Sequence, residues 1–329
     1  MEKITRWGIL STAKIGRKAV IPALQASAMA EVSAVASRDG QSARTFASQM
    51  GIPRAYEGYD ALLADPEIDA IYNPLPNHLH KTWTIRAAEV GKHILCEKPL
   101  AVTVKDCREM IAAARTNGVQ LMEAFMYRYH PRIQAVRQMV NESAIGETHT
   151  IESAFTFMLA DPSNIRLKPE MGGGALMDVG CYCVNLSRLL AGREPVAVNA
   201  RAHWAASGVD EQLTGLLDFG DGLIAHFDCG FNQVHRQRCL IAGSKGTLEL
   251  PIAFNMGIAA TQLLETKLTG DSQVHTFPAV DMYRLMAEDF MHAIAGQEPA
   301  FPIEDALGNL RVIEALLASA HQNGQSVLV

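Results

Sequence analysis

The sequence has no long apolar run and no long run of charge of one sign. None of its 329 residues belongs to a segment approaching the roughly 18 uninterrupted apolar residues of a membrane-spanning helix. The net charge of -6 is mild, which argues against nucleic acid or an anionic membrane as a partner. The first residues lack the apolar core of a signal peptide, so we expect a cytoplasmic protein with a small-molecule partner.

Metal and disulfide patterns are also missing. The six cysteines form no CxxC pair, and no HExxH motif occurs among the eleven histidines. Zinc sites and disulfide frameworks are usually recognised by such spacings. We therefore predict no metal site and expect reduced thiols that fill core positions.

What is present suits a compact protein of two domains. Charged residues make up 19% of the chain and the hydrophobic class 48%, a balance typical of folded proteins and not of disordered ones. A chain of 329 residues exceeds one typical core.

Short apolar runs and helical patterns alternate over about the first 120 residues. The expected strands are residues 7–10, 32–36, 68–72, 93–95 and 119–122, and helical patterns lie between them. Pro22 should kink or restart the first helix, and Gly51 should end the second. The alternation predicts an α/β fold in which residues 1–123 form a doubly wound, dinucleotide-binding Rossmann domain.

The turn after the first expected strand is a degraded form of the GxGxxG fingerprint. Ser11, Ala13 and Gly16 occupy the three glycine positions. Small residues there allow a tight turn, a close approach of backbone to pyrophosphate, and close packing of helix on strand. By itself the pattern fits an ordinary strand-turn-helix equally well.

The end of the second expected strand favours NADP. An NAD enzyme usually has an acidic residue about 20 residues after the glycine turn, whereas arginine accommodates a 2′-phosphate. Ser37 and Arg38 occupy that place, and a hydroxyl beside a guanidinium suits a phosphate. Asp39 is close enough to leave NAD open.

Cys96-Glu97-Lys98-Pro99 follows the strand-like run 93–95. Ligands of open α/β sheets bind at such carboxyl ends of strands. Pro99 restricts the backbone of Lys98 and so aims its ammonium group. As an isolated tripeptide, Glu-Lys-Pro is more often an exposed loop.

Several segments, in order, resemble the Gfo/Idh/MocA oxidoreductase family, particularly its branch of NADP-dependent D-xylose dehydrogenases and dimeric dihydrodiol dehydrogenase. They are residues 7–16, Asn73-Pro74-Leu75-Pro76-Asn77-His78, Glu97-Lys98-Pro99, 123–131 and 172–182. The resemblance implies a cofactor site formed by Ser11, Thr12, Ala13, Lys14, Ile15, Ser37, Arg38, Asn73, Pro74, Leu75, Asn77, His78, Glu97 and Lys98.

The pattern changes in the second half. Strand-like runs cover residues 151–157, 196–204, 212–219, 223–231 and 236–242, and Gly220-Asp221-Gly222 is a hairpin signal. Two helices are expected near 282–295 and 304–323. We predict that residues 124–329 form an α+β substrate domain with a large open, mostly antiparallel sheet. The resemblance implies a homodimer or higher homo-oligomer through that sheet.

Gly172-Gly173-Gly174 would let backbone pass close to a ligand, and Asp178 and Tyr182 follow four residues apart. Without further context, Asp178 would be read as an acid at a helix N-terminus and Tyr182 as a core tyrosine. The family motif makes them active-site candidates, and the resemblance implies a catalytic set of Lys98, Asp178 and Tyr182. Tyr182 would be the general acid/base, Lys98 would lower its pKa and bind the reacting oxygen, and Asp178 would orient the substrate hydroxyl or Lys98.

Arg128, Asn164 and Arg166, with His130, are candidate substrate contacts, although each is equally well explained as a surface or interdomain residue. Together these features predict an NADP-dependent dehydrogenase or reductase acting on a sugar or related polyol, with oxidation of an aldose at its anomeric carbon as the first choice. The alternatives are a dihydrodiol dehydrogenase or anhydro-sugar reductase, and a non-catalytic NADP-sensing protein.

Overall fold

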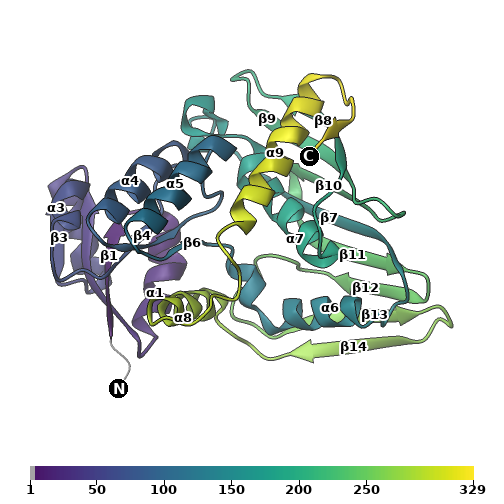
Figure 1. The fold of residues 1–329 in the computed structure, drawn as a ribbon, viewed down its shortest axis with the longest axis horizontal. Helices are drawn as coiled ribbons and strands as arrows, with labels where there is room; N and C mark the ends of the chain where they lie inside the picture. Colours follow the sequence, from purple (N-terminus) through teal and green to yellow (C-terminus); the bar gives the residue numbers. More distant parts are fainter. Residues whose placement is uncertain (1–3) are drawn as a thin grey trace. The chain divides into compact units, whose positions relative to one another are not determined.

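The computed structural model describes residues 4–329 and divides into two compact units (Figure 1). The first runs to Met126 and also includes Asp281–Leu307, and the second comprises Tyr127–Val280 and Gly308–Val329. The domains expected from chain order, 1–123 and 124–329, differ from these units because a late segment packs against the first. Within it the Phe290 ring lies 5.5 Å from Trp7, and Glu288 accepts a hydrogen bond from Ser27.

The first unit contains a six-stranded parallel sheet in the order β3-β2-β1-β4-β5-β6. Its strands are β1 (Thr5–Leu10), β2 (Ala30–Ser37), β3 (Arg54–Glu57), β4 (Ala70–Asn73), β5 (His93–Cys96) and β6 (Leu121–Glu123). The doubly wound sheet is therefore confirmed. The strand order reverses between β1 and β4, and the crevice outside such a switch point is where ligands of open α/β sheets bind.

The helices of this unit are η1 (Gly16–Val20, a π-helical turn), α1 (Ile21–Gln25), α2 (Gly40–Met50), α3 (Tyr59–Leu63), α4 (Asn77–Glu89), α5 (Val104–Thr116) and α8 (Met282–Ile294). The first helix restarts at α1 with Pro22 in its first turn, as expected. Gly51 ends α2 in the left-handed conformation, also as expected.

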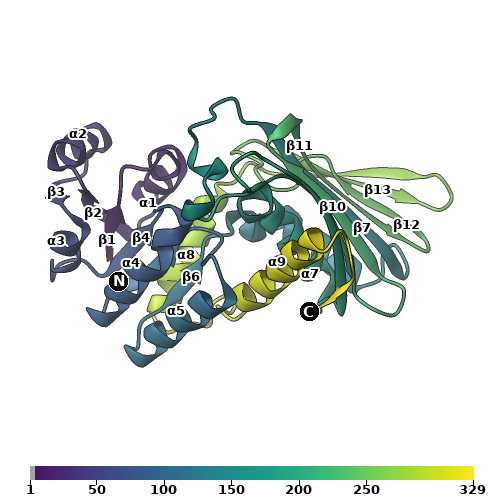
Figure 2. The same cartoon turned by 90° about the horizontal axis from the view of Figure 1, so that it is seen from above.

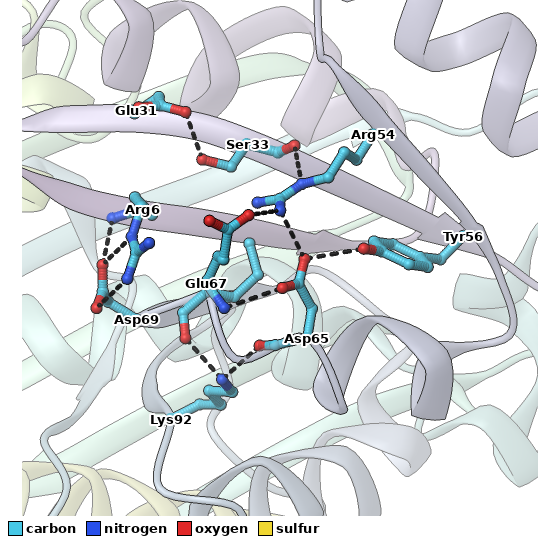
Figure 3. A network of polar contacts seen from close by, with 10 residues as sticks. Arg6, Glu31, Ser33, Arg54, Tyr56, Asp65, Glu67, Asp69 and Lys92 are labelled. Atoms are coloured by element: carbon cyan, nitrogen blue, oxygen red, sulfur yellow. Dashed lines mark hydrogen bonds and ion pairs between the residues drawn. The ribbon is translucent and has the colours of Figure 1, made fainter.

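A network of charged groups lies at the amino-terminal ends of the strands (Figure 3). Lys92, just before β5, donates to the carbonyl oxygens of Asp65 and Ile68 at 2.7 Å each. Burial lowers the pKa of Lys92. Arg54 pairs with Asp65, which also accepts from Tyr56. This network stabilises the edge opposite the carboxyl ends of the strands, and the contacts that its charges make are internal to the first unit.

The second unit contains a nine-stranded mixed sheet in the order β14-β13-β12-β11-β7-β10-β9-β8-β15. The strands are β7 (Thr148–Met158), β8 (Ala197–Trp204), β9 (Asp210–Asp218), β10 (Ile224–Gly230), β11 (Asn232–Gly243), β12 (Gly246–Leu250), β13 (Thr261–Lys267), β14 (Ser272–Phe277) and β15 (Val327–Leu328). Seven of its eight neighbouring pairs are antiparallel, and only β7 with β10 is parallel. The expected hairpin at 220–222 joins β9 to β10.

Helices cover one face of this sheet. They include α6 (Pro131–Asn141), α7 (Cys181–Ala191) and α9 (Asp305–His321), with short turns η2 (Met126–Tyr129), η3 (Ile165–Leu167), η4 (Pro169–Met171) and η5 (Leu176–Gly180, π-helical). Figure 2 shows α7 and α9 on the same side, and no helix of the described chain covers the opposite side. All six cysteines are buried, as expected, and none of them is in a disulfide. No helix of residues 4–329 is long and apolar enough to cross a membrane.

His130, one of the expected substrate contacts, is the N-cap of α6. Its side chain is fully buried, and Nδ1 accepts the backbone N–H of Arg132 at 3.1 Å. Burial and the neighbouring Arg132 lower the pKa of His130 to about 4. The ring is therefore neutral at pH 7, and protonation of Nδ1 would break the cap.

We predict that replacing His130 with asparagine reduces the acid sensitivity of the fold. Because the folded pKa lies below the unfolded value of about 6.5, this histidine weakens the folded state as pH falls through 6.5 toward 4. The wild type should lose about 2 kcal/mol more unfolding free energy between pH 7 and pH 5 than His130→Asn, which keeps a capping oxygen. Urea unfolding at both pH values measures this, with exposed His149→Asn as the control. Equal pH dependence in wild type and His130→Asn would contradict it.

Candidate active site

Three motifs of the first unit meet at the carboxyl edge of its sheet. Ser11 follows β1, Asn73 ends β4, and Glu97 follows β5. The backbone N–H of Glu97 donates to the carbonyl oxygen of Asn73 at 3.0 Å, which joins the last two motifs. The parallel order brings them to the switch point between β1 and β4.

The first turn keeps the shape of a nucleotide-binding turn without its first two glycines. Ser11 has a φ of 84°, a left-handed conformation usually occupied by glycine. Its N–H donates to Ala36, and its hydroxyl accepts the N–H of Ala13 at 3.3 Å. Gly16 is buried, and a Cβ there would lie 3.6 Å from Tyr72. Thr12, Lys14 and Ile15 lie in the same turn and remain partly or fully exposed.

The end of β2 presents a hydroxyl and a cation. Ser37 is partly exposed and Arg38 is exposed. Among residues 4–329, the Arg38 guanidinium makes no hydrogen bond or ion pair. Asp39 instead caps α2 by accepting the N–H of Ser42 at 2.7 Å, and this bond lowers the pKa of Asp39. Asp39, the acidic residue that kept NAD as an alternative cofactor, therefore already caps a helix.

The loop after β4 is held from inside. Asn73 is fully buried, and its amide donates to His80 O and Thr84 and accepts from Leu75 N. Its side chain therefore shapes the loop. Pro74 and Leu75 are buried too, whereas Asn77 is partly exposed and His78 is exposed at the start of α4.

His80 links this loop to the Glu97-Lys98-Pro99 motif. Its ring is fully buried, with Nε2 2.7 Å from the carbonyl oxygen of Leu75 and Nδ1 2.9 Å from that of Pro99. Burial lowers the pKa of His80 to about 4. A neutral imidazole donates from one nitrogen only, so one of these two contacts is the hydrogen bond.

Glu97 is also held by a tyrosine. The Tyr72 hydroxyl donates to its carboxylate at 2.6 Å. Burial and Glu97 raise the pKa of Tyr72 well above 10, and the same two causes raise the pKa of Tyr283 in α8. Lys98, the next residue, is partly exposed and joined to Pro99 by a cis peptide bond.

In the second unit, Asp178 and Tyr182 share a neighbour. Arg166 Nε donates to the Asp178 carboxylate at 2.5 Å. That ion pair raises the pKa of Arg166, and Tyr182 contributes in the same direction. The structure therefore brings together two predicted catalytic residues and one predicted substrate contact.

Tyr182 lies among aromatic rings. It is 6% exposed, and its ring centroid lies 5.4 to 5.8 Å from those of Tyr127, Phe155 and Phe254. The Tyr127 hydroxyl donates to Asn185 at 2.6 Å. The arrangement combines an apolar wall with an ion pair and a phenol, which suits a group that moves a proton.

The glycine-rich turn packs against the protein's own backbone. A Cβ on Gly173 would lie 2.4 Å from the Arg166 carbonyl oxygen and 2.8 Å from that of Lys168. The N–H of Gly173 donates to Lys168 O at 3.1 Å, and that of Gly174 to Arg166 O at 2.9 Å. These glycines are expected to allow a close approach of a ligand, and they also make room for the chain's own backbone.

Of the remaining substrate candidates, one caps a short helix and the other is buried. Asn164 caps η3 by accepting the N–H of Arg166 at 3.1 Å. Arg128 lies in η2 and is 3% exposed. Neither placement tests a contact with substrate.

Asp210 was not recognised from the sequence. It is 3% exposed, and Oδ2 accepts the N–H of Leu176, the first residue of η5, at 2.6 Å. Burial raises the pKa of Asp210 to about 7, although the hydrogen bonds from Leu176 and Ala175 oppose the rise. The acidic residue lies 34 positions from its partner along the chain, so no local spacing indicates the contact.

Comparisons with known proteins agree along the whole chain. Residues 5–125 match the model of an oxidoreductase family with an NAD-binding Rossmann fold, and residues 133–249 match the GFO/IDH/MocA C-terminal domain. The chain is 39% identical to a D-xylose 1-dehydrogenase (NADP(+)) of Haloferax volcanii, covering 95% of this chain and 97% of that protein.

Two further relatives differ in their named reactions. A trans-1,2-dihydrobenzene-1,2-diol dehydrogenase of Xenopus laevis is 36% identical over 75% of each chain. A 3-ketoreductase from Actinomadura kijaniata, solved in complex with NADP and TDP-benzene, superposes with a TM-score of 0.92 at 31% identity, covering 96% of this chain and 98% of that one. From its sequence motifs, its two sheets and these matches, the chain belongs to the GFO/IDH/MocA oxidoreductase family.

Proposed function

We propose that this protein is an NADP-dependent oxidoreductase that transfers a hydride between the nicotinamide and a CH–OH carbon of a sugar or related polyol. Oxidation of an aldose at its anomeric carbon is the preferred reaction, as the name of the Haloferax volcanii relative suggests. The observation that carries the proposal is the grouping of Asp178, Arg166 and Tyr182 beside an apolar aromatic wall.

Several residues of the first unit support the binding of NADP. Small residues form the turn after β1, and backbone N–H groups at the start of the helix that follows would hold the pyrophosphate. Ser37 and the unpaired Arg38 supply a hydroxyl and a fork of N–H donors for a 2′-phosphate. NADP bound there supplies the hydride acceptor or donor.

The chain's own residues handle the proton and the reacting oxygen. Oxidation of a hydroxyl leaves one proton to remove, and Tyr182 takes it at the phenol oxygen. A free phenol, with a pKa of about 10, is a poor base at pH 7, so nearby cations that favour the phenolate are needed. We assign Lys98 to the reacting oxygen and Asp178, held by Arg166, to orienting a substrate hydroxyl.

Removing the Tyr182 hydroxyl should abolish most turnover. Tyr182→Phe and Lys98→Met are each expected to lower kcat by about 100- to 10,000-fold, the range of general acid–base catalysis. The measurement is steady-state formation of reduced nicotinamide with the best sugar. Tyr127→Phe, whose hydroxyl donates to Asn185, is the matched control and should stay within about tenfold of wild type. Wild-type kcat in both Tyr182→Phe and Lys98→Met would contradict the mechanism.

Arg38 should set the cofactor preference. Arg38→Ala removes a charge-assisted contact to the 2′-phosphate and should lower the ratio of kcat/KM for NADP to that for NAD by about 10- to 100-fold. The loss should appear in KM for NADP. Arg115→Ala, which removes an exposed positive charge from the same unit, should leave the ratio unchanged. An unchanged ratio in Arg38→Ala would show that the cofactor does not use this residue.

We also propose a cytoplasmic homodimer formed through the uncovered face of the nine-stranded sheet. Six buried cysteines, none of them in a disulfide, suit a reducing compartment. The uncovered face carries exposed Leu216 on β9 and Ile224 on β10 beside the ion pairs Arg236–Asp228 and Arg238–Glu152. Apolar positions among charged pairs favour burial against a second copy of the same face.

Analytical ultracentrifugation tests this assembly. The wild type is expected at twice the chain mass of 35.8 kDa, and a Leu216→Glu, Ile224→Glu double variant at the chain mass, because four carboxylates would be buried across the two-fold axis. Val90→Glu, at an exposed apolar position outside the sheet, is the control. A monomeric wild type, or a double variant that stays dimeric, would contradict the proposed interface.

A further inference from the structure

We propose that Asp210 is a positioning residue of the second unit, holding the start of the helix that carries Asp178 and Tyr182. Its catalytic consequence rests on the proposed function. Asp210 is the first residue of β9, and Leu176 is the first residue of η5, which continues directly into α7.

The carboxylate replaces a missing local cap. The first N–H groups of a helix have no acceptor within the helix, and a side chain just before it usually supplies one. Ala175 precedes η5 and provides no side-chain cap. Asp210 Oδ2 accepts the Leu176 N–H at 2.6 Å from a different strand, so the acceptor that the helix lacks locally comes from β9.

Gly174 makes room for this acid. Its φ is 117°, and a Cβ there would lie 2.2 Å from Asp210 Oδ1. Gly174 is also hydrogen-bonded to the catalytic candidate itself, since the Asp178 N–H donates to the Gly174 carbonyl oxygen at 3.0 Å. Asp210 therefore touches both sides of the turn from which Asp178 projects.

The same turn holds the partner of Asp178. Gly174 N–H donates to the carbonyl oxygen of Arg166, whose guanidinium pairs with Asp178. One buried carboxylate thus fixes the glycine turn, the turn fixes Arg166, and Arg166 orients Asp178 beside Tyr182. Asp210 acts through these groups, and we assign it no contact with substrate.

Kinetics and hydrogen exchange on the full-length protein test the assignment together. In Asp210→Ala, kcat with the best sugar should fall about 100-fold while KM for NADP stays within about threefold, since a misplacement of about 1 Å costs that much in rate. Asp210→Asn keeps an acceptor oxygen for Leu176 and should recover kcat to within about tenfold of wild type. Asp271→Ala, in the turn between β13 and β14, is the matched control.

Hydrogen exchange separates this proposal from the proposed function. Peptides covering residues 172–185 should exchange at least about tenfold faster in Asp210→Ala than in wild type or Asp271→Ala, whether or not any sugar is turned over. If wild type turns over no sugar but this difference appears, the proposed function fails and the positioning role stands. Unchanged exchange and wild-type kcat in a folded Asp210→Ala would overturn the positioning role.

If Asp210→Ala does not fold, a second variant perturbs the contact between Asp210 and the glycine turn. Gly174→Ala places a methyl group against the carboxylate and should lower kcat and speed exchange in the same peptides. Gly51→Ala, at a left-handed helix end with open space around it, controls for the backbone cost of losing a glycine. Wild-type kcat and exchange in Gly174→Ala would overturn the proposal.

Discussion

The grouping of Arg166, Asp178 and Tyr182 in the second unit depends on a close approach of backbone that only glycine permits. At Gly173 and Gly174 a Cβ would collide with the carbonyl oxygen of Arg166 and with the carboxylate of Asp210. Without side chains there, η5 begins against a buried acid and the chain that carries Arg166 lies beside Asp178. Arg166, whose carbonyl oxygen accepts the N–H of Gly174 in this turn, forms the ion pair with Asp178.

In the first unit, the candidate cofactor residues are positioned by the parallel sheet and by hydrogen bonds within the loops that follow its strands. Parallel strands put the ends of β1, β4 and β5 at one edge, and internal hydrogen bonds then shape the loops there. Asn73 and His80 are fully buried, so their contribution is to hold the loop after β4 and the segment at Pro99. The exposed groups left at this edge include Arg38 and His78, which are available to a ligand.

Patterns within short stretches of sequence predicted the elements that depend on neighbouring residues alone. The alternation of short apolar runs indicated the parallel sheet, Pro22 indicated the restart at α1, and residues 220–222 indicated the β9–β10 hairpin. The strands β3, β12, β13, β14 and β15 and the helix α6 were not predicted. The buried positions of β13 include the polar residues Thr261 and Glu265, and β14 is mostly exposed, so the apolar alternation that marks a strand is weak there.

The contacts among the candidate site residues could not be predicted from the sequence, because they join residues 12 or more positions apart. Asp178 and Tyr182 were recognised from a motif, but Arg166 as the partner of Asp178 depends on how the glycine turn folds back. Late residues such as Phe290 pack with the first unit for the same reason, through tertiary contacts that chain order does not reveal. The catalytic roles of Lys98, Asp178 and Tyr182 stay predictions.

The most direct test is a steady-state assay of the wild-type protein for formation of NADPH from NADP, with aldoses, inositols and trans-dihydrodiols compared in parallel with NAD. The account predicts turnover of at least one aldose, with NADP preferred over NAD and a lactone as the product. Tight binding of NADP without turnover of any of these compounds would contradict it and favour a sensing role.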